Sequence, residues 1–459
     1  MNTYDHLVGG ARGARACDAN GLRRQTPSRA SQGALLSRRE LVAAGCGALG
    51  AAAALGLVGM TGAGGALAAD ASSAADGKSG SASSAASSMD GSTASGSAEG
   101  SVTLTDIKGR EVTVNLPVQR AYVGFYLENI LTIAGPDAFT HVCAWSAYDT
   151  EGYFLSMSQL MRERCAGYAD MVDVGSTLQD DLDYERLLSL KPDCLIIANY
   201  QYASFEDHLP AFESAGIPVV VINYSRGNTQ DFEDSTRILG KVFQQQDRAE
   251  ELIALKADAT ADVLARVKDV SPRKVTFNEY QSMIASFSEI GTSDTKDGFI
   301  GMLIEEAGGD DITADAEAGD DGAQASPEEI LAADPDVMFL IGGDYSDDSR
   351  QGARMGVGVT EQQTVDSMKG MVAARTGWSS LKAIRNGDVY LIDNAIGRTV
   401  RDYTLLQFMA KSMYPDLFAD VDPDRNNADF LAKYLPDIAD MQCMTFYHYA
   451  QAAQDAQNG

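Results

Sequence analysis

The segment 247–270, DRAEELIALKADATADVLARVKDV, constrains the fold of this chain more than any other segment. Its apolar residues recur mostly in steps of three or four, as they do on one face of an α-helix. Asp247, followed three residues later by Glu250, is an acidic variant of the capping box, and Ser271-Pro272 marks the end. Such a helix is a rod roughly 35 Å long, about the width of a small domain. We therefore predict that it joins two separate parts of the chain.

Short apolar runs alternate with helical patterns on both sides of this rod. Runs that are apolar on both faces and separated by helices are typical of parallel sheets covered on both sides. The predicted fold is α/β, with two lobes, each a parallel-type β-sheet covered by helices, bridged by one long rigid helix. The predicted strands are 121–125, 141–145, 194–198, 219–222, 274–278, 336–341 and 388–392, after a hairpin at 102–117 around Lys108-Gly109. The predicted helices outside the rod are 231–243, 299–307, 327–332, 360–375 and 402–413.

The total of 459 residues exceeds what one core usually fills, which favours two lobes and a tail. We predict an export signal or N-terminal anchor at 1–69 and a Ser/Ala/Gly-rich linker at 70–100. The N-terminal lobe is predicted at 101–230, the helical connection at 231–271 and the C-terminal lobe at 272–459.

The N-terminal region indicates export. Arg38-Arg39 precede a weakly hydrophobic Ala/Gly-rich run and the small residues Ala66-Leu67-Ala68, a pattern typical of twin-arginine signals. The sequence leaves open whether the leader is cleaved after Ala68, lipidated at Cys46, or kept as an anchor. We expect an exported protein, in the periplasm or on the outer face of the cytoplasmic membrane, with tethering left open.

Charge and cysteine content narrow the classes of function. The net charge of −29 argues against binding to nucleic acid or to an anionic membrane, because both would be repelled. Cys143, Cys165, Cys194 and Cys443 lack the spacing of a metal site, so they are interpreted as buried thiols or at most one bridge.

An internal repeat supports two similar halves. Residues 184–193, YERLLSLKPD, and 327–336, PEEILAADPD, each place a glutamate in the first turn of a short helix, seven residues before a Pro-Asp and an apolar strand. The two glutamates are Glu185 and Glu328.

In order and spacing, these pieces resemble the solute-binding proteins of ABC importers that carry ferric siderophores, haem and cobalamin, class III of the periplasmic binding proteins. The resemblance covers about 102–418, including DVGSTLQDDLDYERLLSLKPDCLII, AFESAGIPVVVIN, the rod and GWSSLKAIRNGDVYLID. It implies a bilobed clamp that holds its ligand between the lobes, works as a monomer, and delivers to an ABC permease with its ATPase. It also implies that Glu185 and Glu328 dock onto permease arginines. Without that role, each would simply be a favourable charge at a helix N-terminus.

Aromatic residues follow nearly every predicted strand, where ligands bind in open α/β sheets. Any single one is more often packing than ligand contact, but together they predict an aromatic-lined cleft suited to a large, partly planar chelate. They are Tyr126, Tyr148, Tyr200, Tyr202, Tyr224, Tyr280 and Tyr345, and Trp145, at the end of the predicted strand 141–145, is a further candidate.

Arg226, Arg398 and Arg401 are candidates to bind the carboxylate or catecholate oxygens of an anionic chelate, with surface ion pairing as the alternative for each. No intrinsic cofactor is predicted. The expected ligand is a ferric siderophore, otherwise haem or a corrinoid, and tyrosinate ligation of iron or haem stays open. His141, His208 and His448 are too scattered for a bare transition metal. A metallocluster enzyme, or a surface sensor or adhesin with the same fold, remains the alternative function.

Overall fold

The computed structural model describes residues 100–225, 229–280, 286–288, 290–291, 299–314, 326–345, 352–442 and 445–449. All of them belong to one compact unit. The predicted leader and linker, with Cys46 and Ala68, lie outside the described residues, as do Arg226 and Cys443.

The first lobe contains a five-stranded sheet in the order β5-β4-β3-β6-β7, with every neighbouring pair parallel. A separate antiparallel hairpin of β1 and β2 opens the lobe, and Gly109 in its turn has a φ of 76°. Its strands are β1 Gly100–Thr105, β2 Glu111–Leu116, β3 Ala121–Val123, β4 Val142–Trp145, β5 Val172–Asp173, β6 Cys194–Ala198 and β7 Val219–Ile222. Its α-helices are α2 Leu127–Ala134, α3 Ala147–Glu151, α4 Leu155–Arg164, α5 Tyr184–Ser189, α6 Tyr202–Phe205, α7 Leu209–Ser214 and α8 Thr229–Val242.

The second lobe contains a five-stranded sheet in the order β12-β11-β10-β8-β9, in which only β12 runs antiparallel to its neighbour. Its strands are β8 Lys274–Tyr280, β9 Gly309–Asp311, β10 Val337–Gly342, β11 Val389–Asp393 and β12 Phe446–His448. Its helices are α10 Phe299–Glu306, α11 Pro327–Ala333, α12 Glu361–Ala374, α13 Lys382–Asn386, α14 Tyr403–Met413 and α15 Pro423–Tyr434, with the 3-10 segments η7 Asn394–Ile396 and η8 Pro436–Gln442.

The predicted α/β fold with two covered sheets is confirmed, and each predicted strand is present to within two residues at either end. The sequence missed β5, β9 and β12, which are edge strands of two or three residues. A segment that short has no readable periodicity.

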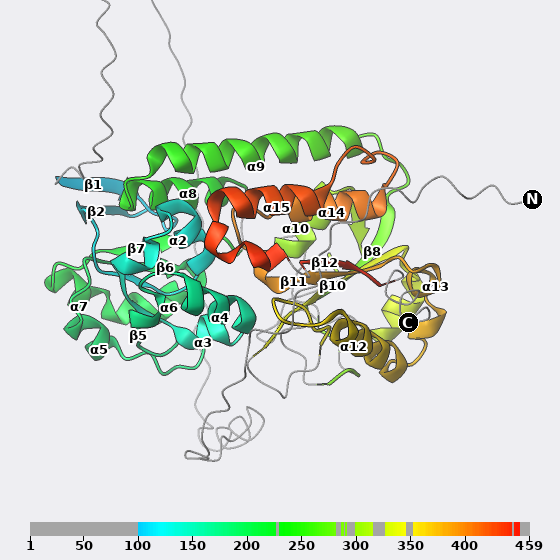
Figure 1. Ribbon diagram of the computed structural model, residues 1–459, viewed down its shortest axis with the longest axis horizontal. Coiled ribbons are helices and arrows are strands. Elements are labelled where there is room, and N and C mark those ends of the chain that lie inside the picture. The colour runs from blue at the N-terminus through cyan, green and yellow to red at the C-terminus, as the bar shows by residue number, and fades with distance from the viewer. Residues whose placement is uncertain are drawn as a thin grey trace, which may run out of the picture. The chain divides into compact units, whose positions relative to one another are not determined.

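The rod is the helix α9, Gln246–Val267. The helix is confirmed, but its predicted capping box is wrong: the N-cap is Gln245, which makes no side-chain cap bond, and Asp247 lies inside the first turn. Leu252 packs in a core cluster of the first lobe, whereas Val263 and Val267 pack in one of the second. In Figure 1, α9 runs along α8 at one end and over α14 at the other, and it contacts both.

The two lobes are joined by more than this helix. Residues of α15 and η8, which follow the second sheet in sequence, pack into the main core of the first lobe. They include Phe430, Leu431 and Ile438, all at most 3% exposed. A continuous apolar contact of this kind resists separation of the lobes, since opening it would expose buried surface to water.

Among the described residues, no helix has both the length and the apolar character needed to cross a membrane. Cys143, Cys165 and Cys194 are free thiols, and the last two are buried.

Candidate ligand-binding site

A pocket lies between the lobes, with an empty volume of about 330 Å³ that includes space open to solvent. Its lining follows the carboxyl ends of β3 and β4 in the first lobe and of β11 in the second, the edge at which open α/β sheets bind ligands. The lining residues are Phe125, Tyr126, Leu127, Glu128, Asn129, Thr150, Phe154, Met157, Ala395, Gly397, Arg398 and Thr399.

The first-lobe wall of the pocket is aromatic. Phe125 is half-buried and contacts three other rings, with centroid distances of 4.8 Å to Tyr126, 6.0 Å to Phe154 and 5.7 Å to Tyr200. Tyr200 is 39% exposed. Tyr148 reaches this cluster through Tyr153, at 6.3 Å. The wall is therefore a cluster of aromatic rings, and its central ring is Phe125, which the sequence analysis did not single out.

Tyr126 joins the wall to the core beneath it. Its backbone is left-handed, with a φ of 63°, and its hydroxyl lies 2.6 Å from Ser225 Oγ. Burial raises the pKa of Tyr126, while the hydrogen bond to Ser225 and the charge of Arg398 oppose the rise. A raised pKa favours the neutral phenol, so Tyr126 offers a ligand a ring edge and a hydroxyl group more readily than a tyrosinate.

A buried polar network supports the same wall from below. Asp149 is fully buried and accepts hydrogen bonds from Ser176 Oγ and from Gln201 Nε2, the latter at 3.0 Å. Gln201 also donates to the carbonyl oxygen of Gly124, next to Phe125, at 3.3 Å. A Cβ on Gly124 would lie 2.3 Å from Gln201 Oε1, so a larger residue there would displace the Gln201 amide from its hydrogen bonds. Burial raises the pKa of Asp149 to about 6, against the lowering effect of its hydrogen bonds.

The second lobe contributes Arg398, whose backbone is also left-handed, with a φ of 66°. Its Nη1 donates to the hydroxyl of Tyr280 at 3.1 Å and to Asn394 Oδ1 at 3.3 Å. The guanidinium carbon lies 5.3 Å from the centroid of the Tyr280 ring. These two contacts leave the guanidinium group of Arg398 among the residues that line the pocket, beside the aromatic wall. The predicted site residues Tyr126, Tyr200, Tyr280 and Arg398 therefore all lie at or next to this pocket.

Arg401 is not placed to bind a ligand, which corrects the sequence-based expectation. It is 1% exposed, and its Nε and Nη2 donate to the two carboxylate oxygens of Glu128 at 2.7 and 3.2 Å. Its Nη1 donates to Asn427 Oδ1 at 2.8 Å. All three nitrogen atoms are engaged within the protein. The sequence offered no signal for this pairing because Glu128 is far away along the chain.

Other predicted aromatic residues lie away from the pocket. Trp145 is 2% exposed and packs on Tyr168 at 5.1 Å, and Tyr224 is 1% exposed, with its hydroxyl 3.1 Å from Thr236 Oγ1. Tyr202 lies on the hairpin side of the lobe, where the Nζ of Lys108 is 4.8 Å from the centroid of its ring. Tyr345 is 7% exposed and does not line the pocket. Proximity to a strand end in the sequence thus does not show which way a side chain points.

The repeat glutamates lie at corresponding places. Glu185 is in the first turn of α5 and Glu328 in the first turn of α11, and both are exposed. Each short helix is followed by the predicted Pro-Asp and then by a central strand, β6 or β10. The internal repeat is therefore a structural one.

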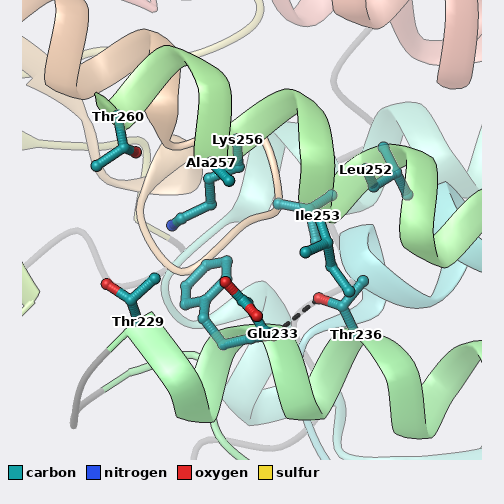
Figure 2. A pocket seen from close by; sticks show the side chains of 10 residues that line it. Thr229, Glu233, Thr236, Leu252, Ile253, Lys256, Ala257 and Thr260 are labelled. Atoms are coloured by element: carbon teal, nitrogen blue, oxygen red, sulfur yellow. Dashed lines mark hydrogen bonds between the residues drawn. The ribbon is translucent and has the colours of Figure 1, made fainter. Parts of the chain in front are cut away.

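A second cavity, with an empty volume of about 320 Å³, lies between α8 and α9. Figure 2 shows Lys256 and Ala257 of α9 facing Thr229 and Thr236 of α8. The Lys256 ammonium is 2.5 Å from Asp402 Oδ1 and 3.5 Å from the centroid of the Phe232 ring. This cavity is lined mainly by helices and not by strand ends, so the pocket with Arg398 is the better candidate site.

Within the ranges that the structure describes, no group of three or more His, Cys, Asp or Glu residues is placed to hold a metal ion.

Comparison with known proteins identifies the family to which this fold belongs. The sequence profile of the family described as "Periplasmic binding protein" matches residues 135–396, more than half of the chain. The chain belongs to this family. The resemblance inferred from the sequence is confirmed, and the chain is an exported substrate-binding protein of the ABC-transporter kind.

Three relatives of this chain illustrate the family of periplasmic binding proteins. A solved TroA-like periplasmic binding protein, FepB from Veillonella parvula, is 26% identical, with a TM-score of 0.68 over 76% of this chain and 99% of that one. The molybdate-binding protein MolA of Haemophilus influenzae is 24% identical over 56% of this chain and 70% of MolA. The petrobactin-binding protein YclQ of Bacillus subtilis is 22% identical over 49% of this chain and 61% of YclQ. The relatives therefore differ in the solute they bind.

Proposed function

We propose that this substrate-binding protein captures an anionic metal chelate, a ferric siderophore in the first instance, with haem or a corrinoid as the other chelates that the same surface would suit. One observation carries the proposal. The guanidinium of Arg398, which donates to Tyr280 and Asn394, lies at a pocket whose first-lobe wall is built of the aromatic rings of Phe125, Tyr126 and Phe154.

The aromatic wall suits the flat surface of such a ligand, and Arg398 suits its negative charge. Ring faces bind the flat, partly apolar surface of a chelate at low entropic cost, because an aromatic side chain has few torsions to fix. A guanidinium donates two parallel hydrogen bonds to a carboxylate or catecholate group and offsets its charge. The acidic protein as a whole would repel an anion, so the local positive charge of Arg398 gains importance.

A small oxyanion is the second candidate, and the size of the pocket favours it. The empty volume of about 330 Å³ includes space open to solvent, so the enclosed part of the pocket is smaller than that. MolA, which binds molybdate, is among the relatives. An oxyanion would use Arg398 but would leave most of the aromatic wall uncovered.

Titration calorimetry with ferric petrobactin, haem, cobalamin and molybdate, supported by native mass spectrometry, tests these alternatives. For an anionic ligand, Arg398→Ala should weaken binding by at least about tenfold. Arg425→Ala, which removes the same charge from an exposed side chain of α15 paired with Asp429, should change affinity by less than about twofold. Binding that is unaffected by Arg398→Ala would refute the anionic-ligand proposal, and binding of molybdate alone would establish the second candidate.

We further propose that Glu185 and Glu328 dock the protein onto its permease, and that the twin-arginine segment directs its export. The docking proposal is supported by the exposure of both carboxylates and by their equivalent positions in the two lobes.

A further inference from the structure

An asparagine of the first lobe holds the backbone of the segment that carries Arg398. Asn129, on α2 of the first lobe, is fully buried. Its Nδ2 donates to the carbonyl oxygen of Arg398 at 2.8 Å, and its Oδ1 accepts from the amide of Val400 at 3.0 Å. The two bonds fix the orientation of the amide, since one partner is an acceptor and the other a donor.

The fastened backbone is one that Arg398 would otherwise disfavour. A residue with a Cβ rarely adopts a φ of 66°, so the conformation persists only where surrounding contacts impose it. Asn129 holds the carbonyl group of Arg398 itself and the amide group two residues later. Val400 is 3% exposed and packs in the core of the first lobe, which secures the same segment from its other side.

We propose that Asn129 is a positioning residue: it sets the direction of the Arg398 guanidinium from the opposite lobe. The inference rests on the proposed binding of an anion by Arg398. Glu128, the neighbour of Asn129, pairs with Arg401 three residues beyond Arg398, so two consecutive residues of α2 hold the two ends of this segment. The anion-binding group of the second lobe is therefore in place before the ligand arrives, and binding needs little movement of the lobes.

A double-mutant cycle tests this role. In Asn129→Asp the bond from Val400 is kept, but a carboxylate oxygen faces the carbonyl oxygen of Arg398 and repels it. Affinity for the probe, ferric petrobactin or molybdate, is measured by calorimetry in the wild-type and Arg398→Ala backgrounds. We expect Asn129→Asp to weaken binding by at least about tenfold when Arg398 is present and by less than about twofold when it is absent. Equal losses in both backgrounds, or no loss in either, would overturn the assignment.

Hydrogen exchange gives a readout that needs no ligand. Asn129→Ser removes both bonds without adding a charge, and it replaces the Asp variant if that one does not fold. Exchange over residues 396–401 should become faster in Asn129→Ser, while exchange in α9 stays as in the wild type. If the wild type binds neither probe, the proposed ligand class is at fault, and this measurement still decides the positioning role. Unchanged exchange over 396–401 would refute it.

Discussion

Glu128 and Arg401 form a buried ion pair between the lobes, and its removal is the most decisive test of how the lobes are held. The two side chains are 4% and 1% exposed. Replacing Glu128 by Gln keeps the shape but leaves the Arg401 charge with Asn427 and at most one amide oxygen as acceptors. The adjacent Asp402 is already paired with Lys256, at 2.5 Å. Leaving such a charge uncompensated should cost about 3–5 kcal/mol in the free energy of unfolding.

Urea unfolding followed by tryptophan fluorescence and by circular dichroism measures this loss. The two tryptophans are suitable reporters because Trp145 is buried in the first lobe and Trp378 in the second. The matched control is Glu250→Gln on α9, which breaks a 2.9 Å pair with Arg237 in which the glutamate is 57% exposed. That control should cost about 1 kcal/mol or less.

Two results would refute the reasoning. A loss below about 1 kcal/mol for Glu128→Gln would mean that Arg401 finds water or another acceptor, and that the lobes are not locked there. The double variant Glu128→Leu/Arg401→Met buries no charge, so it should regain most of the lost stability. If it is as unstable as the single variant, lost packing and not the uncompensated charge is the cause.

The remaining predictions concern pH and docking. Because burial raises the pKa of Asp149 to about 6, above its ordinary value of 3.8, its folded form binds a proton more tightly than its unfolded form. This carboxyl group should therefore lower the stability of the protein by about 2.5 kcal/mol between pH 4 and pH 7. The loss should be absent from urea titrations of Asp149→Asn, and parallel pH profiles of the two proteins would contradict the prediction. For docking, Glu185→Lys or Glu328→Lys should abolish uptake in cells without changing solute affinity, whereas Glu213→Lys, an exposed charge on α7, should leave both unchanged. Normal uptake by both docking variants would remove the proposed role.

Much of the fold could be predicted from the sequence because it depends on local patterns. The apolar runs at 194–198 and 219–222 correspond residue for residue to β6 and β7. The long helix could be predicted because the amphipathic pattern repeats several times over its 22 residues. Its start was misplaced because a capping motif in sequence competes with the tertiary position of the chain, and here Gln245 is the N-cap.

The site was only partly predictable. Tyr126, Tyr200, Tyr280 and Arg398 could be expected to lie close together because topology brings the carboxyl ends of parallel strands to one edge. Their contact with a ligand stays a prediction. Whether a side chain there faces the pocket or the core depends on neighbours far away in sequence. Trp145 turned into the core, and Phe125 took the central place in the wall.

The sequence alone therefore determined the two α/β lobes, the helix between them, the repeat of Glu185 and Glu328, and the family. These features depend on periodicity and local spacing, which can be recognised without knowing which residues are in contact. The tertiary structure decided that Arg401 pairs with Glu128 and that Asn129 holds the backbone of Arg398. Each of these contacts joins residues that are 269 to 273 positions apart in the sequence. No local sequence pattern can predict a contact over that distance.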